Sequence, residues 1–353
     1  MRVSSQYPKW PRTWGLDRFS MAQYRELVPI ASRCSGAIVR NQKIAASRLK
    51  QSSFPKPGVI GLTFIIFVSI ALFNSQRRML NADGDLATHI FLGRKVLEHG
   101  ITFTSDWSHT KPGGTFTAFE WLSEAIYLKA FELGGLAAVH VFATLVIATS
   151  ITLVAVFFRS RLTPLLSMPI IGLVGLLSAT HWIARPHLFT FLCLALLLGL
   201  VTRGISYRYL LFIGPFFAVW ANLHPGFVYG LIMFGAFLAG DYVDQGWRRI
   251  PWLQVSAFGA AFTATFLNLL GWDLHLHIIE VLQDPRSYKL IGEYWPTEIW
   301  SFWGATFYCT VACLAIFCIA VRRLPKVSTL LVVLASTILA AEYFRNVALF
   351  ALF

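Results

Sequence analysis

The chain has 353 residues, of which 56% are hydrophobic and only 13% are charged, whereas about 25% of residues are charged in soluble domains. This composition excludes an ordinary soluble enzyme and predicts an all-α protein that crosses a membrane many times. The net charge of +13 lies largely beside apolar segments, so we expect membrane lipids, and no nucleic acid, as partners.

Residues 1–57 form a basic, serine-rich segment that precedes the first apolar run. They hold eleven lysines and arginines and two acidic residues. The segment lacks the ordered parts of a cleaved signal peptide. We therefore expect a cytoplasmic tail that lies against anionic lipid headgroups, followed by one transmembrane domain over residues 58–353.

Nine apolar segments follow, and most approach the ~20 residues that a helix needs to cross a bilayer. They lie at 58–75, 135–158, 164–182, 186–202, 207–223, 225–242, 252–271, 303–321 and 327–342. If the tail is inside, four inner connections carry the basic residues Arg159 and Arg161, Arg203 and Arg208, Arg248 and Arg249, and Arg322, Arg323 and Lys326. This is the positive-inside pattern, and it predicts about nine spans in a multi-pass membrane protein with a cytoplasmic N-terminus.

The first outer connection, residues 76–134, holds seven acidic and six basic residues, and the second, residues 272–302, holds five and two. Apolar residues at helical spacing predict an interfacial helix that begins beside Asp83 or Asp85 and ends at Gly100. A second interfacial helix is predicted over 118–133. The ionisable residues available for chemistry thus face outward, away from cytosolic ATP and nucleotide sugars.

Short segments of the chain are similar to one group of known membrane proteins. They are Gly84–Arg94, Phe119–Glu124, Ala184–Thr190, Trp220–Phe227 and Arg345–Phe350. These segments, with the order of spans and outer loop, resemble a bacterial branch of the GT-C superfamily of integral-membrane glycosyltransferases. The resemblance implies a GT-C-like fold, a polyprenyl-phosphate sugar donor, an extracytoplasmic active face, and a chain that continues beyond Phe353. The Trp-Trp-Asp motif of oligosaccharyltransferases is absent from the sequence, which argues against protein N-glycosylation.

Sugar transfer needs a base for the acceptor proton, and three carboxylates are the candidates. Asp85 and Asp83 follow the first span, and Glu120 lies in an apolar, aromatic segment. The two aspartates could instead hold a divalent metal, Mg²⁺ or Mn²⁺, or cap the following helix. Glu120 could instead form an interfacial ion pair with a lysine.

The departing phosphate needs positive charge, and Arg185 is the main candidate because it stands at an outer helix start and a guanidinium binds phosphate bidentately. Anchoring at lipid headgroups is the alternative for Arg185. Other residues at outer positions are candidates for substrate binding, each with a structural alternative: Arg94, Glu124, His187, Asn222 and His224.

Two other classes of function stay open. A transporter or flippase of envelope precursors would place charges near mid-membrane on broken helices, often in repeated halves. In this sequence the charges gather at outer span ends and no repeat is visible, which disfavours that class. An inactive membrane scaffold is the other alternative.

Overall fold

The computed structural model describes residues 57–74, 79–80, 84–105, 107, 112–159, 164–203, 207–246, 252–322 and 324–353. All of them belong to one compact unit, Pro55–Phe353. Residues 1–56 of the predicted basic tail, Asp83, and the basic residues Arg161, Arg248, Arg249 and Arg323 lie outside the described residues.

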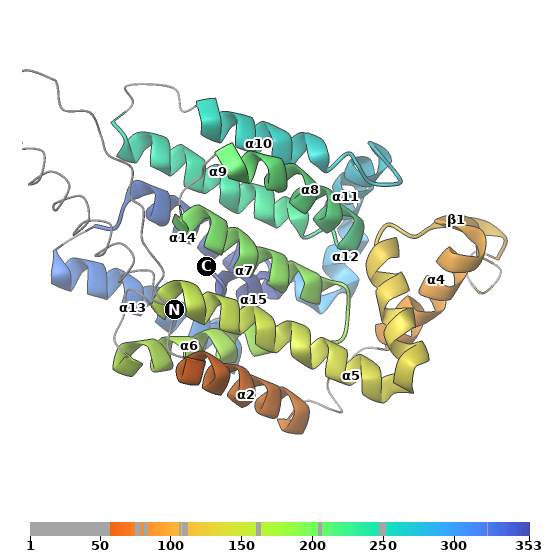
Figure 1. Cartoon of the computed structure of the whole chain (residues 1–353), viewed down its shortest axis with the longest axis horizontal. Coiled ribbons are helices and arrows are strands. Elements are labelled where there is room, and N and C mark those ends of the chain that lie inside the picture. The colour runs from red at the N-terminus through yellow and green to blue at the C-terminus, as the bar shows by residue number, and fades with distance from the viewer. Residues whose placement is uncertain are drawn as a thin grey trace, which may run out of the picture. The chain divides into compact units, whose positions relative to one another are not determined.

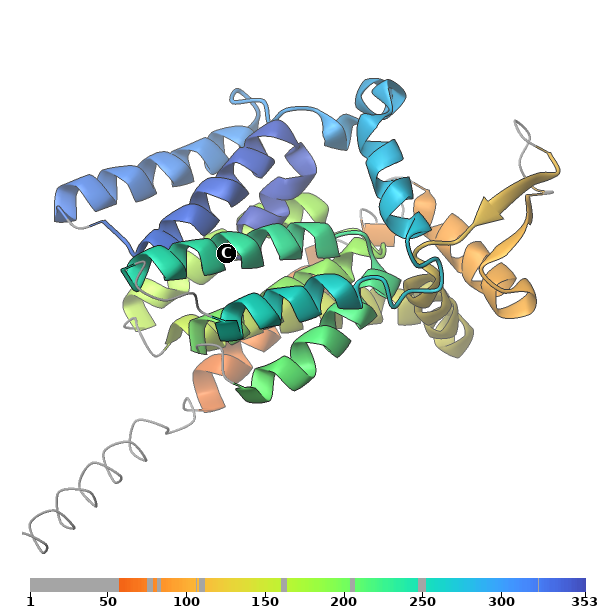
Figure 2. The ribbon, with the colours of Figure 1, turned by 90° about the horizontal axis from the view of Figure 1, so that it is seen from above.

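The described chain is mostly helical, as predicted. Its α-helices are α2 (Pro57–Asn74), α4 (Asp85–His99), α5 (Trp121–Arg159), α6 (Pro164–Ser178), α7 (His187–Arg203), α8 (Tyr207–Leu223), α9 (Phe227–Asp244), α10 (Trp252–Ala264), α11 (Asp273–Gln283), α12 (Pro285–Leu290), α13 (Phe302–Val321), α14 (Val327–Glu342) and α15 (Val347–Phe350). Short 3₁₀ turns are η1 (Ala179–His181), η2 (Gly292–Tyr294) and η3 (Phe344–Asn346). The long apolar helices lie side by side, and α4 and α11 lie beyond one end of them (Figures 1 and 2).

The prediction of about nine membrane-crossing helices is wrong. In the described residues three helices are long and apolar enough to cross a membrane, Trp121–Phe158, Phe227–Asp244 and Phe302–Val321. The shorter apolar helices, of 10–17 residues, are Thr63–Leu72, Ser167–His181, His187–Thr202, Leu211–Leu223 and Val327–Glu342. Apolar composition continues through turns, so it overestimates helix length. α10, for example, ends at Ala264 although the apolar run reaches residue 271. The three long helices support a membrane protein.

The all-α prediction also needs correction, because the first outer connection contains a β-hairpin. Strands β1 (Thr102–Ser105) and β2 (Gly114–Thr117) pair antiparallel, with Phe103 opposite Phe116. Trp107 packs edge-on against Phe116 and against Phe91 of α4. Threonine and phenylalanine favour strands, but runs of four residues are too short to stand out in the sequence.

Helices are present at the two positions where interfacial helices were predicted. The first is α4, which ends at Gly100 as predicted. The second is the first part of α5, which breaks at Gly134 and Gly135 before its apolar part begins. Gly135 has a φ of +63°, a left-handed conformation that glycine adopts without strain. The break separates the outer segment of α5 from its apolar segment.

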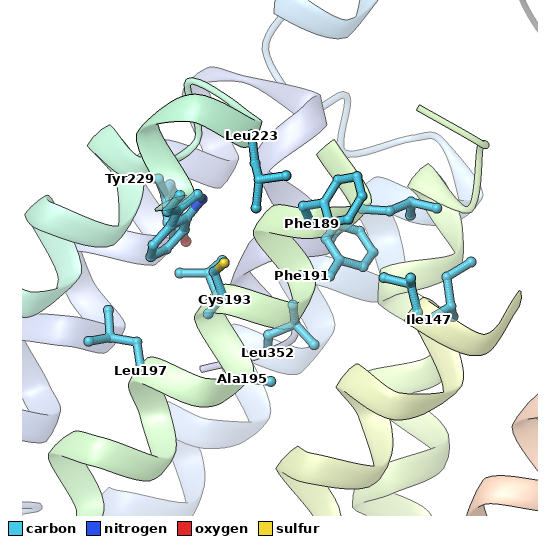
Figure 3. Close-up of a cluster of buried hydrophobic side chains, with 14 of the residues drawn as sticks. Ile147, Phe189, Phe191, Cys193, Ala195, Leu197, Leu223, Tyr229 and Leu352 are labelled. Atoms are coloured by element: carbon cyan, nitrogen blue, oxygen red, sulfur yellow. The ribbon is translucent and has the colours of Figure 1, made fainter. Parts of the chain in front are cut away.

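Close packing joins the outer elements to the apolar helices. α4 lies against α5 at Gly93, where an added Cβ would lie only 2.3 Å from the backbone oxygen of Glu124. α5, α7, α8 and α9 meet in a buried core, and Figure 3 shows Ile147, Phe191, Leu223 and Tyr229 among its side chains. The start of α5 is therefore fixed both to α4 and to the core.

Successive helices from α7 to α10 run in opposite directions, so their connections alternate between the two ends of the bundle (Figure 1). One end carries the segment before α7, the α8–α9 connection and the long segment between α10 and α13. The exposed basic residues Arg322 and Lys326 lie in the α13–α14 connection, at the opposite end. The candidate site described below gathers where α4, α7, α9 and α11 come together.

Candidate functional site

A cavity of about 550 Å³ opens among these outer connections. Its polar wall comes from α4, from the segments that precede α5 and α7, from the α8–α9 connection and from η2 and η3. Its apolar wall comes from α9, α11, α14 and α15 through the side chains of Val228, Ile232, Ile278, Val281, Leu282, Leu339 and Leu349. The cavity therefore combines titratable groups with a long apolar lining.

Arg185 connects two acidic residues in the polar wall. Its Nη2 lies 2.5 Å from Oδ2 of Asp85, and its Nη1 lies 3.4 Å from Oε1 of Glu293. The Arg185 side chain is 19% exposed and that of Asp85 is 54% exposed. The carboxylate of Asp85 thus stands at the open edge of the cavity, and the guanidinium lies deeper.

Arg345 supplies a second positive charge to the same cavity. Its guanidinium carbon lies 5.0 Å from the ring centroid of Tyr294, in a cation–π contact. His181, Arg185 and Arg345 all lower the pKa of Glu293, and the Nε2 of His181 lies 3.7 Å from that carboxylate. The two arginines and Glu293 therefore form one electrostatic group.

The hydrogen bonds around His224 fix its tautomer. Its Nδ1 accepts from the backbone N–H of Gly226 at 2.8 Å and lies 2.9 Å from Oγ1 of Thr190. A backbone N–H can only donate, so Nδ1 carries no proton and Nε2 carries one. Nε2 lies 3.5 Å from Oε1 of Glu120. Burial and the charge of Arg345 lower the pKa of His224 well below its usual range, which agrees with a neutral ring.

Glu120 lies next to a second carboxylate, Glu124, and to His89. Nδ1 of His89 is 3.5 Å from Oε1 of Glu124. Burial raises the pKa of Glu120 to about 7, with a further rise from Glu124 and opposition from His89, Arg345 and Arg185. Burial alone would lower the pKa of His89, but Glu124, Glu120 and Asp85 together raise it.

Five of the predicted site residues line the cavity: Asp85, Glu120, Arg185, His187 and His224. His187 donates from Nε2 to the backbone oxygen of His181 at 2.8 Å, since a carbonyl can only accept. The fold therefore brings together residues that lie up to 139 positions apart in the sequence.

Three predicted substrate-binding residues lie elsewhere. Glu124 is buried behind the cavity wall, with its side chain 4% exposed. The amide of Asn222 is engaged on both sides, accepting from Nε1 of Trp121 at 2.8 Å and donating to the backbone oxygens of Ala218 and Leu267. It fixes the start of α5 rather than facing the cavity. Arg94 is on the exposed face of α4.

The metal predicted at Asp83 and Asp85 stays a prediction. Asp83 lies outside the described residues, and the carboxylate of Asp85 is already paired with a guanidinium. A cation at Asp85 would have to compete with Arg185 for the same oxygens.

Among the cavity residues that the sequence-based site omitted are three charged or titratable ones, His89, Glu293 and Arg345. Each had a weak signal. His89 lies one turn after Asp85, Glu293 is one of five acidic residues in the second outer connection, and Arg345 begins one of the segments that carry the GT-C resemblance.

Comparison with protein-family models, with curated proteins and with solved structures found no match to this chain.

Proposed function

We propose that this protein is a membrane glycosyltransferase that moves a sugar from a polyprenyl-phosphate donor to an acceptor on the extracytoplasmic side. The observation that carries the proposal is the set of side chains that line the cavity. Two arginines, Arg185 and Arg345, share it with the carboxylates of Asp85 and Glu120, and one side of it is apolar. A lipid-linked sugar phosphate presents the matching chemistry, with an anion, hydroxyl groups and an apolar chain.

The arginines would hold the phosphate of the donor. Guanidinium groups bind phosphate through paired N–H donors and stay charged at any physiological pH. Arg185 now offers its two terminal nitrogens to Asp85 and Glu293. An arriving phosphate would compete with Asp85 for this guanidinium, which leaves the Asp85 carboxylate available as a base.

Asp85 would then accept the proton of the acceptor hydroxyl. The acceptor oxygen forms a bond to the anomeric carbon as the bond from that carbon to the phosphate oxygen breaks. The negative charge on the departing polyprenyl phosphate is balanced by Arg185 and Arg345. One displacement of this kind inverts the anomeric configuration. The exposed position of Asp85 suits an acceptor that enters from outside the membrane.

The prenyl chain would lie along the apolar wall formed by α9, α11 and α14. Ile232 and Leu339 belong to this wall, together with Val281 and Leu282. Burial of each methylene there contributes about 0.8 kcal/mol, so chain length should affect donor affinity.

The test uses purified full-length protein with polyprenyl-phosphate sugars extracted from bacterial membranes. Mass spectrometry would follow the loss of lipid-linked sugar and the appearance of free polyprenyl phosphate. Release that depends on the protein supports the transferase. Movement of intact donor across a vesicle bilayer without release would identify a flippase. If neither activity is detected, the scaffold alternative is the one that is left.

A further inference from the structure

We propose that His89, Glu120 and Glu124 form a binding site for a divalent transition metal, of the Zn²⁺ or Mn²⁺ class. One ligand atom from each residue, a histidine nitrogen and two carboxylate oxygens, lies within 4.8 Å of the other two. Ligands at about 2.1 Å from a tetrahedral zinc ion are roughly 3.4 Å apart, and Nδ1 of His89 is 3.5 Å from Oε1 of Glu124. All three distances are at most 4.8 Å, so a modest contraction would complete the ligand set.

The buried polar atoms of this cluster point to a cation independently of its geometry. The Glu124 side chain is only 4% exposed, and its Oε2 has no hydrogen-bond partner among the described residues. Nδ1 of His89 is also buried without a hydrogen bond in that part of the chain. A buried carboxylate oxygen without a donor is costly, and a metal ion bound by both oxygens of Glu124 and by Nδ1 of His89 would satisfy all of these atoms.

Charge and ligand type select the class of metal. Two carboxylates balance the charge of a divalent ion, so His89 can bind as a neutral ring. Mg²⁺ and Ca²⁺ favour oxygen ligands throughout, whereas an imidazole nitrogen favours zinc and related transition metals. This site is distinct from the aspartate pair suggested by the sequence, since His89 lies one turn further along α4 and the two glutamates lie just before α5 and in its first turn.

The surroundings position the ligands and leave the metal accessible. His89 and Glu120 line the cavity, and Glu124 lies behind them, so open coordination positions would face the cavity. Nε2 of His224 lies 3.5 Å from Oε1 of Glu120, a place where outer-shell donors stand around metal ligands. Gly93 allows α4 to approach the backbone of Glu124, which brings the histidine to the two glutamates.

The experiment measures metal content, and it is independent of the proposed sugar transfer because no donor is needed. Full-length protein without a histidine tag is stripped with a chelator and titrated with Zn²⁺ and with Mn²⁺. We expect one bound ion per chain in the parent. His89→Gln and Glu124→Gln should weaken binding by more than about 100-fold, because even outer-shell changes cost 10–100-fold.

Matched controls lie on the same two helices. His99 and Glu132 have side chains 52% and 43% exposed and lie outside the cluster, so His99→Gln and Glu132→Gln should bind metal like the parent. A variant that gains a spectroscopic signal distinguishes loss of a metal ligand from misfolding. His89→Cys loaded with Co²⁺ should show a thiolate-to-cobalt charge-transfer absorption that the parent lacks.

Two results would overturn the site. Equal metal content in all four glutamine variants, with no charge-transfer band in His89→Cys, would place the metal elsewhere. Absence of bound Zn²⁺ and Mn²⁺ from the folded parent would mean that Glu120, Glu124 and His89 share a proton instead.

Discussion

Arg185 uses both terminal nitrogens of its guanidinium, Nη2 toward Asp85 and Nη1 toward Glu293. A lysine keeps the charge and has three donors, but its compact ammonium lacks the planar fork that binds a phosphate bidentately. Each hydrogen bond to a charged partner contributes about 1.5–3 kcal/mol, and 1.4 kcal/mol is a factor of ten in affinity. We therefore expect Arg185→Lys to raise the donor KM by about tenfold or more, and Arg185→Ala to raise it further.

The measurement is the dependence of transfer on donor concentration in the two variants and the parent. Arg94→Lys is the matched control, because Arg94 lies on an exposed face of α4 outside the cavity. If Arg185→Lys used limiting donor as well as the parent does, Arg185 would be a headgroup anchor and not a phosphate ligand.

Individual residues also mark the limit of inference from sequence. Arg185, Asp85 and His224 could be named because charged or polar groups at the ends of apolar segments are few in this chain. Their partners could not be named. Asp85 pairs with Arg185 across 100 positions and Glu293 pairs with it across 108, and no local pattern encodes such contacts.

At the scale of elements, the packing of α4 on α5 depends on the small size of Gly93. An added Cβ would lie 2.3 Å from the backbone oxygen of Glu124, so Gly93→Ala should force the helices apart. Overpacking of this kind costs about 1–3 kcal/mol. We expect a lower apparent melting temperature and weaker metal binding, measured by thermal denaturation and by metal titration.

Gly172→Ala in α6 is the control for that change, because nothing lies within 4 Å of the added Cβ. It should melt at the temperature of the parent or slightly above, since alanine favours the helix by about 1 kcal/mol. Equal melting temperatures of the two variants would show that α4 and α5 do not pack closely at Gly93.

The positions of helices were more predictable than their lengths. Glycine and charge at segment ends located α4, α5 and α8 to within a few residues. Helix lengths were predicted wrongly where the apolar sequence continues through η1 or past Ala264, because a turn inside apolar surroundings keeps an apolar sequence. The β-hairpin was not predicted because four-residue strands show too few alternations of apolar and polar residues to be distinguished from a loop.

For the whole molecule, the account requires the cavity and the basic connections to lie on opposite sides of the membrane. Glu98 is exposed on α4, and Lys326 is exposed between α13 and α14. In a variant without native cysteines, an impermeant maleimide should label Glu98→Cys in intact cells. It should label Lys326→Cys only after the cells are permeabilised. The reverse pattern would place the cavity in the cytoplasm and exclude the proposed extracytoplasmic reaction.

The most direct test of the central claim compares two carboxylates on one helix in the transfer assay. Asp85 and Glu98 both belong to α4, with side chains 54% and 53% exposed, but only Asp85 lines the cavity. Loss of a general base typically costs ~10²–10⁴ in rate. The account predicts that Asp85→Asn loses the release of polyprenyl phosphate by that factor, while Glu98→Gln releases it like the parent. Parent-like release by Asp85→Asn, or the absence of any release by the parent, would contradict it.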